Sequence, residues 1–546
     1  MSQRETALGR PSLEQMRKTI HRTFTLILLL STLSAACAPS ARYWIPPRSV
    51  EPIRLEATLE PNQVFFRPEA TLSATTNPGS TDSIPAPTPT PEKAATIPIP
   101  VPGILDTHNN PILYYAQPAD TLPVVAVRFG VDPSEIQSTQ PIPETAYLTP
   151  GQLLLIPSRL SKTTSAQRLI PDSEIVFSPS ATDFDIASFV KEAGGRLDIE
   201  QEWLKSSGLI DGAEVIQKVS MDNSINPRLL LALLEYQGGW VFGFPDTQDR
   251  LEYPLGYRSR SMKGLFNQLM WAIEQLSKGY YAYREGRMTE IRFQDGSTAR
   301  LAPDLNAGSV ALQYFFAQLY QEDEWSKALD PEVGFPAFYT EKFGDPWQRA
   351  QKVEPLFPPG IEQPPLILPF ERNKTWSFTG GPHGAWDAEG PYAALDFAPG
   401  SIRPGCEKSN AWTLAAASGL VIRSGNGVVT LDLDGDGRQE TGWVLVYTHV
   451  ASEGATPVGT WVDTGDLLGN PSCEGGFATG THVHIARKYN GEWIPAYGPL
   501  PFNLGGWIAD YGGKAYRGTL VRDGDVVKAC TCSNFETFIT RRENDP

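Results

Sequence analysis

The sequence is poor in positive charge, in histidine, in cysteine and in long apolar runs. Its 46 Lys and Arg residues stand against 62 Asp and Glu, which gives a formal net charge of −16. Binding to nucleic acid depends on Lys and Arg neutralising phosphates, so this balance argues against that class of partner. An apolar run from Phe24 to Ala36 is shorter than the about 20 residues that a membrane-spanning helix needs. The 546 residues include six histidines, five cysteines and no Cys-x-x-Cys pair, which argues against a zinc site built from thiolates.

The length predicts several domains, because single hydrophobic cores rarely grow beyond about 250–300 residues. At the N-terminus, basic residues precede the apolar run, as in a signal peptide over residues 1–37. Leu33-Ser34-Ala35-Ala36-Cys37 resembles a lipoprotein signal, although Ser34 stands where an aliphatic residue is usual. We predict lipid attachment at Cys37 and an extracytoplasmic protein anchored to a membrane. Ordinary cleavage after a small residue is the alternative, and translation from Met16 is a second hypothesis.

Residues 38–110 are rich in Pro, Thr, Ser and Ala, most clearly in Pro85–Pro91. Such a composition cannot bury a core and favours extended polyproline geometry, so we predict a disordered tether. A second, shorter linker is predicted at 159–182.

Residues 111–158 have the pattern of a small βααβ unit. A strand and turn open it, a short helix over 124–131 ends at Gly130, a second helix begins near Asp132, and a strand closes it before Pro157. The order resembles a LysM domain, with Ala119 at a position where glycine is usual. The resemblance implies binding to glycan that contains N-acetylglucosamine; a degenerate module that only spaces the chain is the alternative.

Residues 183–355 are predicted to be mainly helical. At the centre, Asn226 can cap a helix that starts at Pro227, is apolar on all sides and stops at Gly238-Gly239. The pattern weakly resembles the lysozyme-like lytic transglycosylases, but Gln237 occupies the place of their catalytic glutamate. Glutamine cannot act as a general acid, and Glu235 is two residues away, on nearly the opposite side of the helix. We therefore predict a helical domain without muramidase activity, with catalysis by Glu235 as the alternative.

The last third of the chain carries the residues most suited to a chemical site. Repeated glycines and β-branched runs predict an antiparallel β domain over 365–546. Gly480–Arg487 is typical of a strand, in which His482 and His484 share one face because side chains alternate. Neutral imidazole is a good zinc ligand, so the pair predicts a metal site. Two more of the six histidines, His383 and His449, lie in the same third.

These histidines, with Asp396 thirteen residues after His383, are spaced as in a known group of enzymes. Residues 376–494 resemble the LytM/lysostaphin-type zinc endopeptidases of the cell wall, and the His-to-Asp spacing is most similar to their β-lytic subgroup. The resemblance implies three zinc ligands, His383, Asp396 and His484. It also implies a catalytic pair beside the metal, His449 and His482.

Asp387 competes with Asp396 for the role of aspartate ligand, because it fits the shorter His-x-x-x-Asp spacing of the wider family. We prefer Asp396, since the runs around it have the strand-loop-strand context of the family's aspartate. Asp387 is then a loop residue exposed to solvent.

Two further features of this third leave alternatives open. Four cysteines follow Cys37, and in an exported protein we expect two disulfides. Cys406–Cys473 with Cys530–Cys532 is one of three possible pairings. The run Asp432, Asp434 and Asp436 opens like a calcium-binding loop, but Trp443 stands where the twelfth-position glutamate belongs. A β-hairpin turn explains the run equally well.

Together these features predict a zinc metalloendopeptidase that hydrolyses peptide bonds in peptidoglycan stems or cross-bridges. The LysM domain would target it to wall glycan, and the lipid anchor would hold it at a membrane. The alternative is a non-catalytic wall-binding lipoprotein or an amidase activator, a role taken by relatives that have lost ligands. The intact set of histidines and aspartate favours the enzyme.

Overall fold

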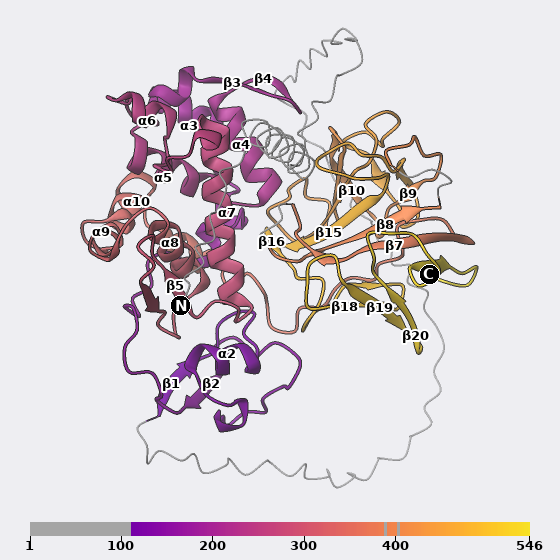
Figure 1. Cartoon of the computed structure of the whole chain (residues 1–546), viewed down its shortest axis with the longest axis horizontal. Helices are drawn as coiled ribbons and strands as arrows, with labels where there is room; N and C mark the ends of the chain where they lie inside the picture. The colour runs from indigo at the N-terminus through magenta and orange to yellow at the C-terminus, as the bar shows by residue number, and fades with distance from the viewer. Residues whose placement is uncertain (1–110, 387–389, 401–404) are drawn as a thin grey trace, which may run out of the picture. The chain divides into compact units, whose positions relative to one another are not determined.

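The computed structural model describes residues 111–386, 390–400 and 405–546 (Figure 1). All of these residues fall within one compact unit, Ile97–Pro546. The signal peptide, Cys37 and the tether predicted for residues 1–110 lie outside the described residues, and so does Asp387. Among the helices of the described part, none has both the length and the apolar composition that crossing a membrane requires.

Residues 112–156 form a small unit in which a helix lies between two paired strands. Its elements are β1 (Ile112–Tyr115), α2 (Leu122–Phe129) and β2 (Leu153–Ile156), and the strands are antiparallel. Tyr114, Phe129 and Leu154 meet in a core of their own. Gly130, at φ +68°, ends α2 as the sequence predicted, because a left-handed residue there stops the helix.

The second helix predicted for this unit is much shorter in the structure than the sequence pattern suggests. Only a three-residue 3₁₀ turn forms, Pro133–Glu135, and the chain is extended again at Ile136. Gln137 then forms an antiparallel β-bridge with Leu155, so pairing with β2 takes the place of the predicted helix. Ala119 adopts φ +63°, the left-handed conformation that explains why glycine is usual at this point. The assignment to LysM stays a prediction.

Residues 186–353 are mainly helical and share one large hydrophobic core. The helices are α3 (Ile186–Ala193), α4 (Gly212–Asn223), α5 (Pro227–Gly238), α6 (Gln248–Glu252), α7 (Leu265–Arg284), α8 (Ala307–Ala317), α9 (Glu322–Ala328), α10 (Phe335–Phe343) and α11 (Pro346–Val353). Two hairpins accompany them, β3 (Gln201–Leu204) with β4 (Gly208–Asp211), and β5 (Glu290–Arg292) with β6 (Thr298–Arg300).

Helix α5 has the ends and the burial that its sequence indicates. The Asn226 side chain accepts a hydrogen bond from Arg228 N at 3.0 Å, and Pro227 occupies the first helical position. Every side chain from Leu229 to Leu234 is fully buried, and Gly239 at φ +65° ends the helix. Because all its faces are covered, α5 is the central helix of this region.

The linker predicted at 159–182 is largely packed into the helical region. Ile170, Ile175 and Val176 are buried in the same core as α5. Asn226 N donates to Ile175 O at 2.8 Å, so the segment also pairs with the loop that leads into α5. The apolar residues in this otherwise polar stretch explain the difference, since burying them stabilises the fold.

Residues 374–541 form antiparallel β structure, which confirms that prediction. The main sheet has the order β13-β10-β11-β12-β15-β8-β7-β21, and β16 pairs with β15. Its strands are β7 (Lys374–His383), β8 (Ala394–Pro399), β10 (Gly419–Gly425), β11 (Val428–Asp432), β12 (Trp443–Thr448), β13 (Trp461–Val462), β15 (Val483–Tyr489), β16 (Glu492–Trp493) and β21 (Phe538–Arg541). A short pair joins β9 (Thr413–Leu414) to β14 (Leu467–Gly469), and a second sheet contains β17 (Asn503–Leu504), β18 (Trp507–Tyr511), β19 (Gly518–Arg522) and β20 (Asp525–Lys528).

The two faces of the main sheet have different neighbours. Val483 and Ile485 on β15 lie in a core that belongs to the β region. Ala486, on the opposite face, packs in the core shared with the helices. Ser224, after α4, donates its hydroxyl to Gly491 O at 2.6 Å. The helices therefore cover part of the face on which His484 also lies, because residues two apart on a strand point the same way.

Candidate metal centre

Three neighbouring strands bring the predicted ligands together. His383 ends β7, Asp396 lies in the middle of β8, and His484 is the second residue of β15. In the antiparallel register His484 is directly opposite Asp396. Opposed residues project to the same face of a sheet, so the pairing itself places a carboxylate beside an imidazole.

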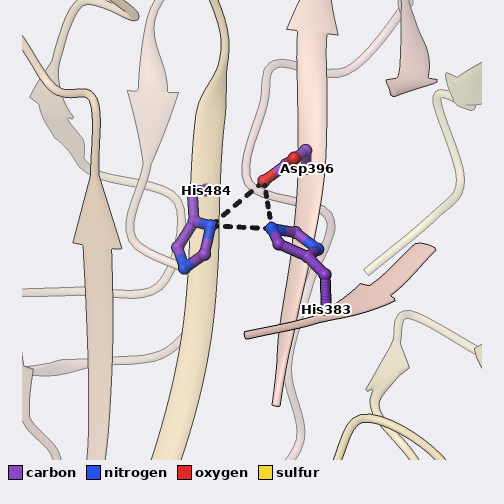
Figure 2. A group of neighbouring side chains, drawn as sticks. All are labelled: His383, Asp396 and His484. Carbon is purple, nitrogen blue, oxygen red and sulfur yellow. Dashed lines mark hydrogen bonds and ion pairs between the residues drawn. The ribbon is translucent and has the colours of Figure 1, made fainter. Parts of the chain in front are cut away.

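The three side chains point at one another, as Figure 2 shows. His383 Nε2 lies 3.0 Å from His484 Nδ1, and each of these nitrogens is 3.2 Å from Asp396 Oδ1. A tetrahedral zinc ion with bonds of about 2.0–2.1 Å would hold its ligand atoms about 3.3 Å apart. The triangle of donor atoms therefore has the size that zinc requires.

The outer nitrogens of the two imidazoles face backbone carbonyl groups. His383 Nδ1 lies 2.8 Å from Gly381 O, and His484 Nε2 lies 2.9 Å from Ala385 O. A carbonyl only accepts, so each of these nitrogens carries the proton and the inner nitrogen keeps its lone pair. Asp396 Oδ1 is buried and receives no hydrogen bond. Two lone pairs and an unsatisfied carboxylate oxygen at one point fit a cation.

The charges of the site also suit a metal ion. Burial raises the pKa of Asp396, but the facing imidazoles, His383 first, outweigh burial and hold that pKa well below its ordinary value. Burial lowers the pKa of His484. For His383, burial acts in the same direction, yet attraction to Asp396 is stronger and raises its pKa. Asp396 and His484 thus favour the protonation states that bind zinc, an ionised carboxylate and a neutral imidazole, whereas on His383 zinc would compete with a proton that Asp396 stabilises.

His449 and His482 lie beside this triangle. Their ring centroids are 4.3 Å apart, and His482 Nε2 is 3.8 Å from Asp396 Oδ1. His449 Nδ1 faces Glu474 O at 2.7 Å and His482 Nδ1 faces Gly480 O at 2.8 Å. By the same argument as for the ligands, both rings keep Nε2 as the unprotonated nitrogen. The structure thus brings all five predicted site residues together, and their separate roles remain predictions.

Burial first, and then the neighbouring His482 and His484, lower the pKa of His449 to about 3. Its imidazole is therefore neutral at neutral pH. His449 also has φ +62°, an uncommon conformation for a residue other than glycine. It follows β12 directly, so this left-handed residue turns the chain at the edge of the site.

A disulfide holds the loops around the second histidine pair. The structure joins Cys406 to Cys473 and Cys530 to Cys532, one of the three pairings that the sequence allowed. Cys473 is next to Glu474, whose carbonyl faces His449. Thr481 N, next to His482, donates to Gly405 O at 3.0 Å. The Cys406–Cys473 link therefore ties together two loops that position His449 and His482.

Two residues of the site escaped the sequence analysis. Tyr516, between β18 and β19, stacks its ring on His383 with centroids 4.2 Å apart and planes at 23°. No local pattern signals this contact, because Tyr516 is more than a hundred residues away in the chain. Gly380 lies opposite Asp396 in the sheet, and its missing side chain leaves room for the carboxylate.

Replacing Gly380 with alanine should weaken metal binding. The added Cβ would lie 2.4 Å from Asp396 Oδ2, so the carboxylate would have to move. Displacing groups that orient a ligand typically costs about 10–100-fold in metal affinity. Titration against a competing zinc chelator measures this loss. Gly400→Ala is the control, because its Cβ would meet only Thr375 O at 4.0 Å. Equal zinc affinity in both variants would show that Asp396 does not need its observed position.

The acidic run of the predicted calcium loop also brings three carboxylates together. Asp432, Asp434 and Asp436 gather their carboxylates at one end of β11. Asp432 is buried and accepts from the backbone N–H groups of Gly435 at 3.2 Å and Gly437 at 2.7 Å. Burial, with a contribution from Asp434, raises the pKa of Asp432 to about 6. These contacts are those of a tight turn between β11 and β12, the alternative that the sequence left open.

Parts of the chain are similar in sequence to known proteins. A protein-family profile described as "LasA, N-terminal domain" matches residues 168–356, which is the helical region. The chain is 27% identical to Protease LasA of Pseudomonas aeruginosa strain UCBPP-PA14 over 334 residues, which cover 55% of this chain and 73% of that protein. Protease LasA of strain PAO1 matches at 27% over 331 residues, with the same coverage. The chain is thus similar to Protease LasA over about half of its length.

The solved structures that resemble parts of the chain include two peptidases. One is described as the novel M23 metalloprotease pseudoalterin from the deep sea, with 24% identity, 31% of this chain and 96% of that one covered, and a TM-score of 0.26. The other is the antimicrobial peptidase lysostaphin from Staphylococcus simulans, with 15% identity, 30% and 81% covered, and a TM-score of 0.17. TM-scores this low carry no functional argument.

Proposed function

We propose that the chain is a zinc metalloendopeptidase that hydrolyses peptide bonds in peptidoglycan stems or cross-bridges. The observation that carries the proposal is the buried triangle of His383 Nε2, Asp396 Oδ1 and His484 Nδ1, with an unsatisfied oxygen at its corner. The similarity to Protease LasA supports peptidase activity. Three protein ligands leave one zinc position for water or substrate, as in catalytic sites.

The chain's own residues would divide the work of hydrolysis. When bound, zinc acts as a Lewis acid that polarises the scissile carbonyl group and activates water. The zinc would be held by His383, Asp396 and His484. Backbone carbonyl groups fix the orientation of both imidazoles. His449 and His482 present Nε2 to the same space, so they can take the proton of the attacking water and stabilise the charge on the scissile carbonyl oxygen.

The other parts of the chain are proposed to place this enzyme at the wall. The unit at 111–158 would bind wall glycan as a LysM domain, and Cys37 would carry a lipid that holds the protein outside the cytoplasm, facing the wall. A calcium ion at Asp432, Asp434 and Asp436 would stiffen the hairpin between β11 and β12. The acidic composition supports the absence of a nucleic-acid partner.

The helical region is proposed to be non-catalytic. Glu235 Oε2 accepts hydrogen bonds from Val241 N at 2.7 Å and Phe242 N at 2.9 Å. These two bonds tie the carboxylate to the backbone that follows α5, which gives Glu235 a structural role there. Gln237 Oε1 accepts from the Tyr320 hydroxyl at 2.7 Å. Both residues thus hold the end of α5 in place.

Digestion of purified peptidoglycan sacculi tests the proposed function. Mass spectrometry of the soluble products should show newly freed amino groups on stem or cross-bridge peptides. A zinc chelator should stop their release and added zinc should restore it, because the metal activates the water. Fragments cut only between sugars would instead assign the activity to the helical region. Unchanged sacculi and no bound zinc would favour a wall-binding protein or an amidase activator.

A further inference from the structure

The orientation of the His449 imidazole depends on one backbone carbonyl group. His449 Nδ1 lies 2.7 Å from Glu474 O. Because a carbonyl only accepts, this contact places the ring proton on Nδ1 and leaves Nε2 free. Any group that fixes the Glu474 carbonyl therefore also fixes which nitrogen His449 presents to the reacting atoms.

The hydroxyl of Ser472 joins the backbone of His449 to that of Glu474. Ser472 Oγ donates to His449 O at 3.1 Å and accepts from Glu474 N at 3.0 Å. Ser472 N also donates to His449 O at 2.6 Å, and Ser472 O accepts from His482 N at 3.3 Å. The contacts close a ring that runs from the His449 carbonyl through the hydroxyl to Glu474, and from the Glu474 carbonyl back to the imidazole.

The carboxylate of Glu474 holds the same residue at a second place. Glu474 Oε2 accepts hydrogen bonds from Ser452 N at 3.0 Å and from Ser452 Oγ at 2.5 Å. Ser452 Oγ in turn accepts from Gly427 N at 3.2 Å. Two donors from one residue give this exposed carboxylate a defined position, so the side chain of Glu474 anchors its own backbone.

Gly427 lies directly behind the peptide unit that carries the carbonyl. It has φ +78°, and a Cβ added there would overlap both Glu474 C and Gly475 N. No side chain fits between the two segments. The turn between β10 and β11, which contains Gly427, therefore backs the Glu474 carbonyl on the side away from its own side chain's anchor.

These supports act beyond the disulfide that holds the same loop. Cys473, between Ser472 and Glu474, is already tied to Cys406. The Ser472 hydroxyl adds a bond to the N–H of Glu474, and Ser452 adds bonds to its carboxylate. Contacts that converge on one residue are what a precisely oriented reacting group requires, because a small displacement of such a group lowers the rate.

We infer that Ser472 and Glu474 are positioning residues for His449. Their side chains fix the carbonyl that holds the imidazole proton on Nδ1, so that Nε2 stays free to act on the reacting atoms. The inference rests on the proposed function, which gives His449 a part in hydrolysis. Zinc binding should not depend on either side chain, because both act on His449, which is not one of the three proposed ligands.

Replacing Ser472 with alanine removes the hydroxyl and keeps the backbone contacts. We expect kcat for a soluble cross-linked peptide to fall about tenfold to a hundredfold, since a reacting group misplaced by about 1 Å can lose about a hundredfold in rate. KM and zinc content should stay unchanged, and Ser472→Thr, which keeps the hydroxyl, should restore most of the rate. Ser165→Ala is the matched control, because Ser165 Oγ accepts from Gln167 N in the same local pattern, outside the β region.

The anchor of Glu474 is tested together with its partner. Glu474→Ala and Ser452→Ala each remove one side of the same contact, so the double variant should be no slower than Glu474→Ala alone. Multiplied losses would mean that the two side chains act separately and would remove Ser452 from the anchor. Glu453→Ala is the control, because Glu453 is an exposed neighbour whose carboxylate pairs with Lys408 Nζ at 3.1 Å. It should leave kcat unchanged.

Nuclear magnetic resonance of the zinc-loaded full chain locates the ring proton without any hydrolysis. With ¹⁵N-labelled histidine, only six residues contribute imidazole signals, and His449→Ala identifies the signal of His449. The proton should lie on Nδ1 in the unmodified chain. In Ser472→Ala and in Glu474→Ala it should be shared between the two nitrogens.

Two results would overturn the inference. The first is an unmoved proton and normal kcat in both Ser472→Ala and Glu474→Ala. The second is loss of zinc in these variants, or an equal loss of kcat in Ser472→Thr, which would make the segment a general support of the fold. Failure of the proposed function is distinguishable, because the unmodified chain would then release no peptide from sacculi. The position of the His449 proton would still decide whether Ser472 and Glu474 orient the ring.

Discussion

Replacing His484 with alanine is expected to remove both the bound zinc and the peptidase activity. Its Nδ1 supplies one corner of the triangle, 3.0 Å from His383 Nε2 and 3.2 Å from Asp396 Oδ1. The metal supplies several kcal/mol of transition-state stabilisation, so its loss should lower the rate of stem-peptide hydrolysis by about a thousandfold or more. Metal analysis of the purified variant and a turnover assay measure the two effects.

Ile485→Val is the control for damage to the strand. Ile485 is the next residue on β15, but it points into the core of the β region. Its shortening should cost about 0.5–1.5 kcal/mol in the free energy of unfolding and leave the zinc in place. If His484→Ala retained one zinc per chain and normal turnover, the assignment of the ligand set would be wrong.

The convergence of His383, Asp396 and His484 is the part of the structure that the sequence predicted best, because it follows largely from local patterns, and their role as metal ligands stays a prediction. Alternation along Gly480–Arg487 was enough to place His482 and His484 on one face. The family resemblance then selected Asp396, and the sheet register sets Asp396 opposite His484. The ends of α5 were predictable for the same reason, since caps depend on residues next to the helix.

Contacts between distant segments could not be predicted in the same way. The stacking of Tyr516 on His383 depends on where the β18–β19 connection lies. Ile170 and Ile175 follow a polar stretch, so local composition suggested a linker, and only the helical core shows that they are buried. The helix predicted near Asp132 does not extend beyond one turn, because Gln137 pairs with Leu155 instead. A tertiary contact thus outweighs the local helix preference.

The helical region contacts the main sheet through charged and aromatic side chains as well as through the shared hydrophobic core. Asp222 on α4 pairs with Arg423 on β10 at 2.5 Å, and the Arg423 guanidinium lies over the Trp386 ring. Trp386 follows Ala385, whose carbonyl accepts from His484 Nε2. A chain of contacts thus runs from α4 to His484 in the candidate metal centre. The helical region therefore helps to hold the loop that fixes the orientation of His484.

Replacing His482 with alanine should keep the zinc and lose most of the turnover. His482 Nε2 is 3.8 Å from Asp396 Oδ1 and is not part of the ligand triangle, so the metal has its three ligands without it. General acid–base catalysis typically contributes about 10²–10⁴-fold, and the fall in kcat should lie in that range. KM should change little, because the group acts on the reacting atoms. Zinc content and steady-state kinetics on one soluble cross-linked peptide separate these effects.

The paired variant His449→Ala decides whether the two imidazoles act as one unit. Their rings are 4.3 Å apart and both present Nε2 to the same space, so removing either should interrupt the same proton transfer. Groups that act together are strongly non-additive, and the double variant should then be no slower than the slower single variant. Multiplied losses in the double variant would instead mean that one imidazole moves the proton and the other stabilises the oxyanion independently. Full activity in either single variant would remove that histidine from the mechanism.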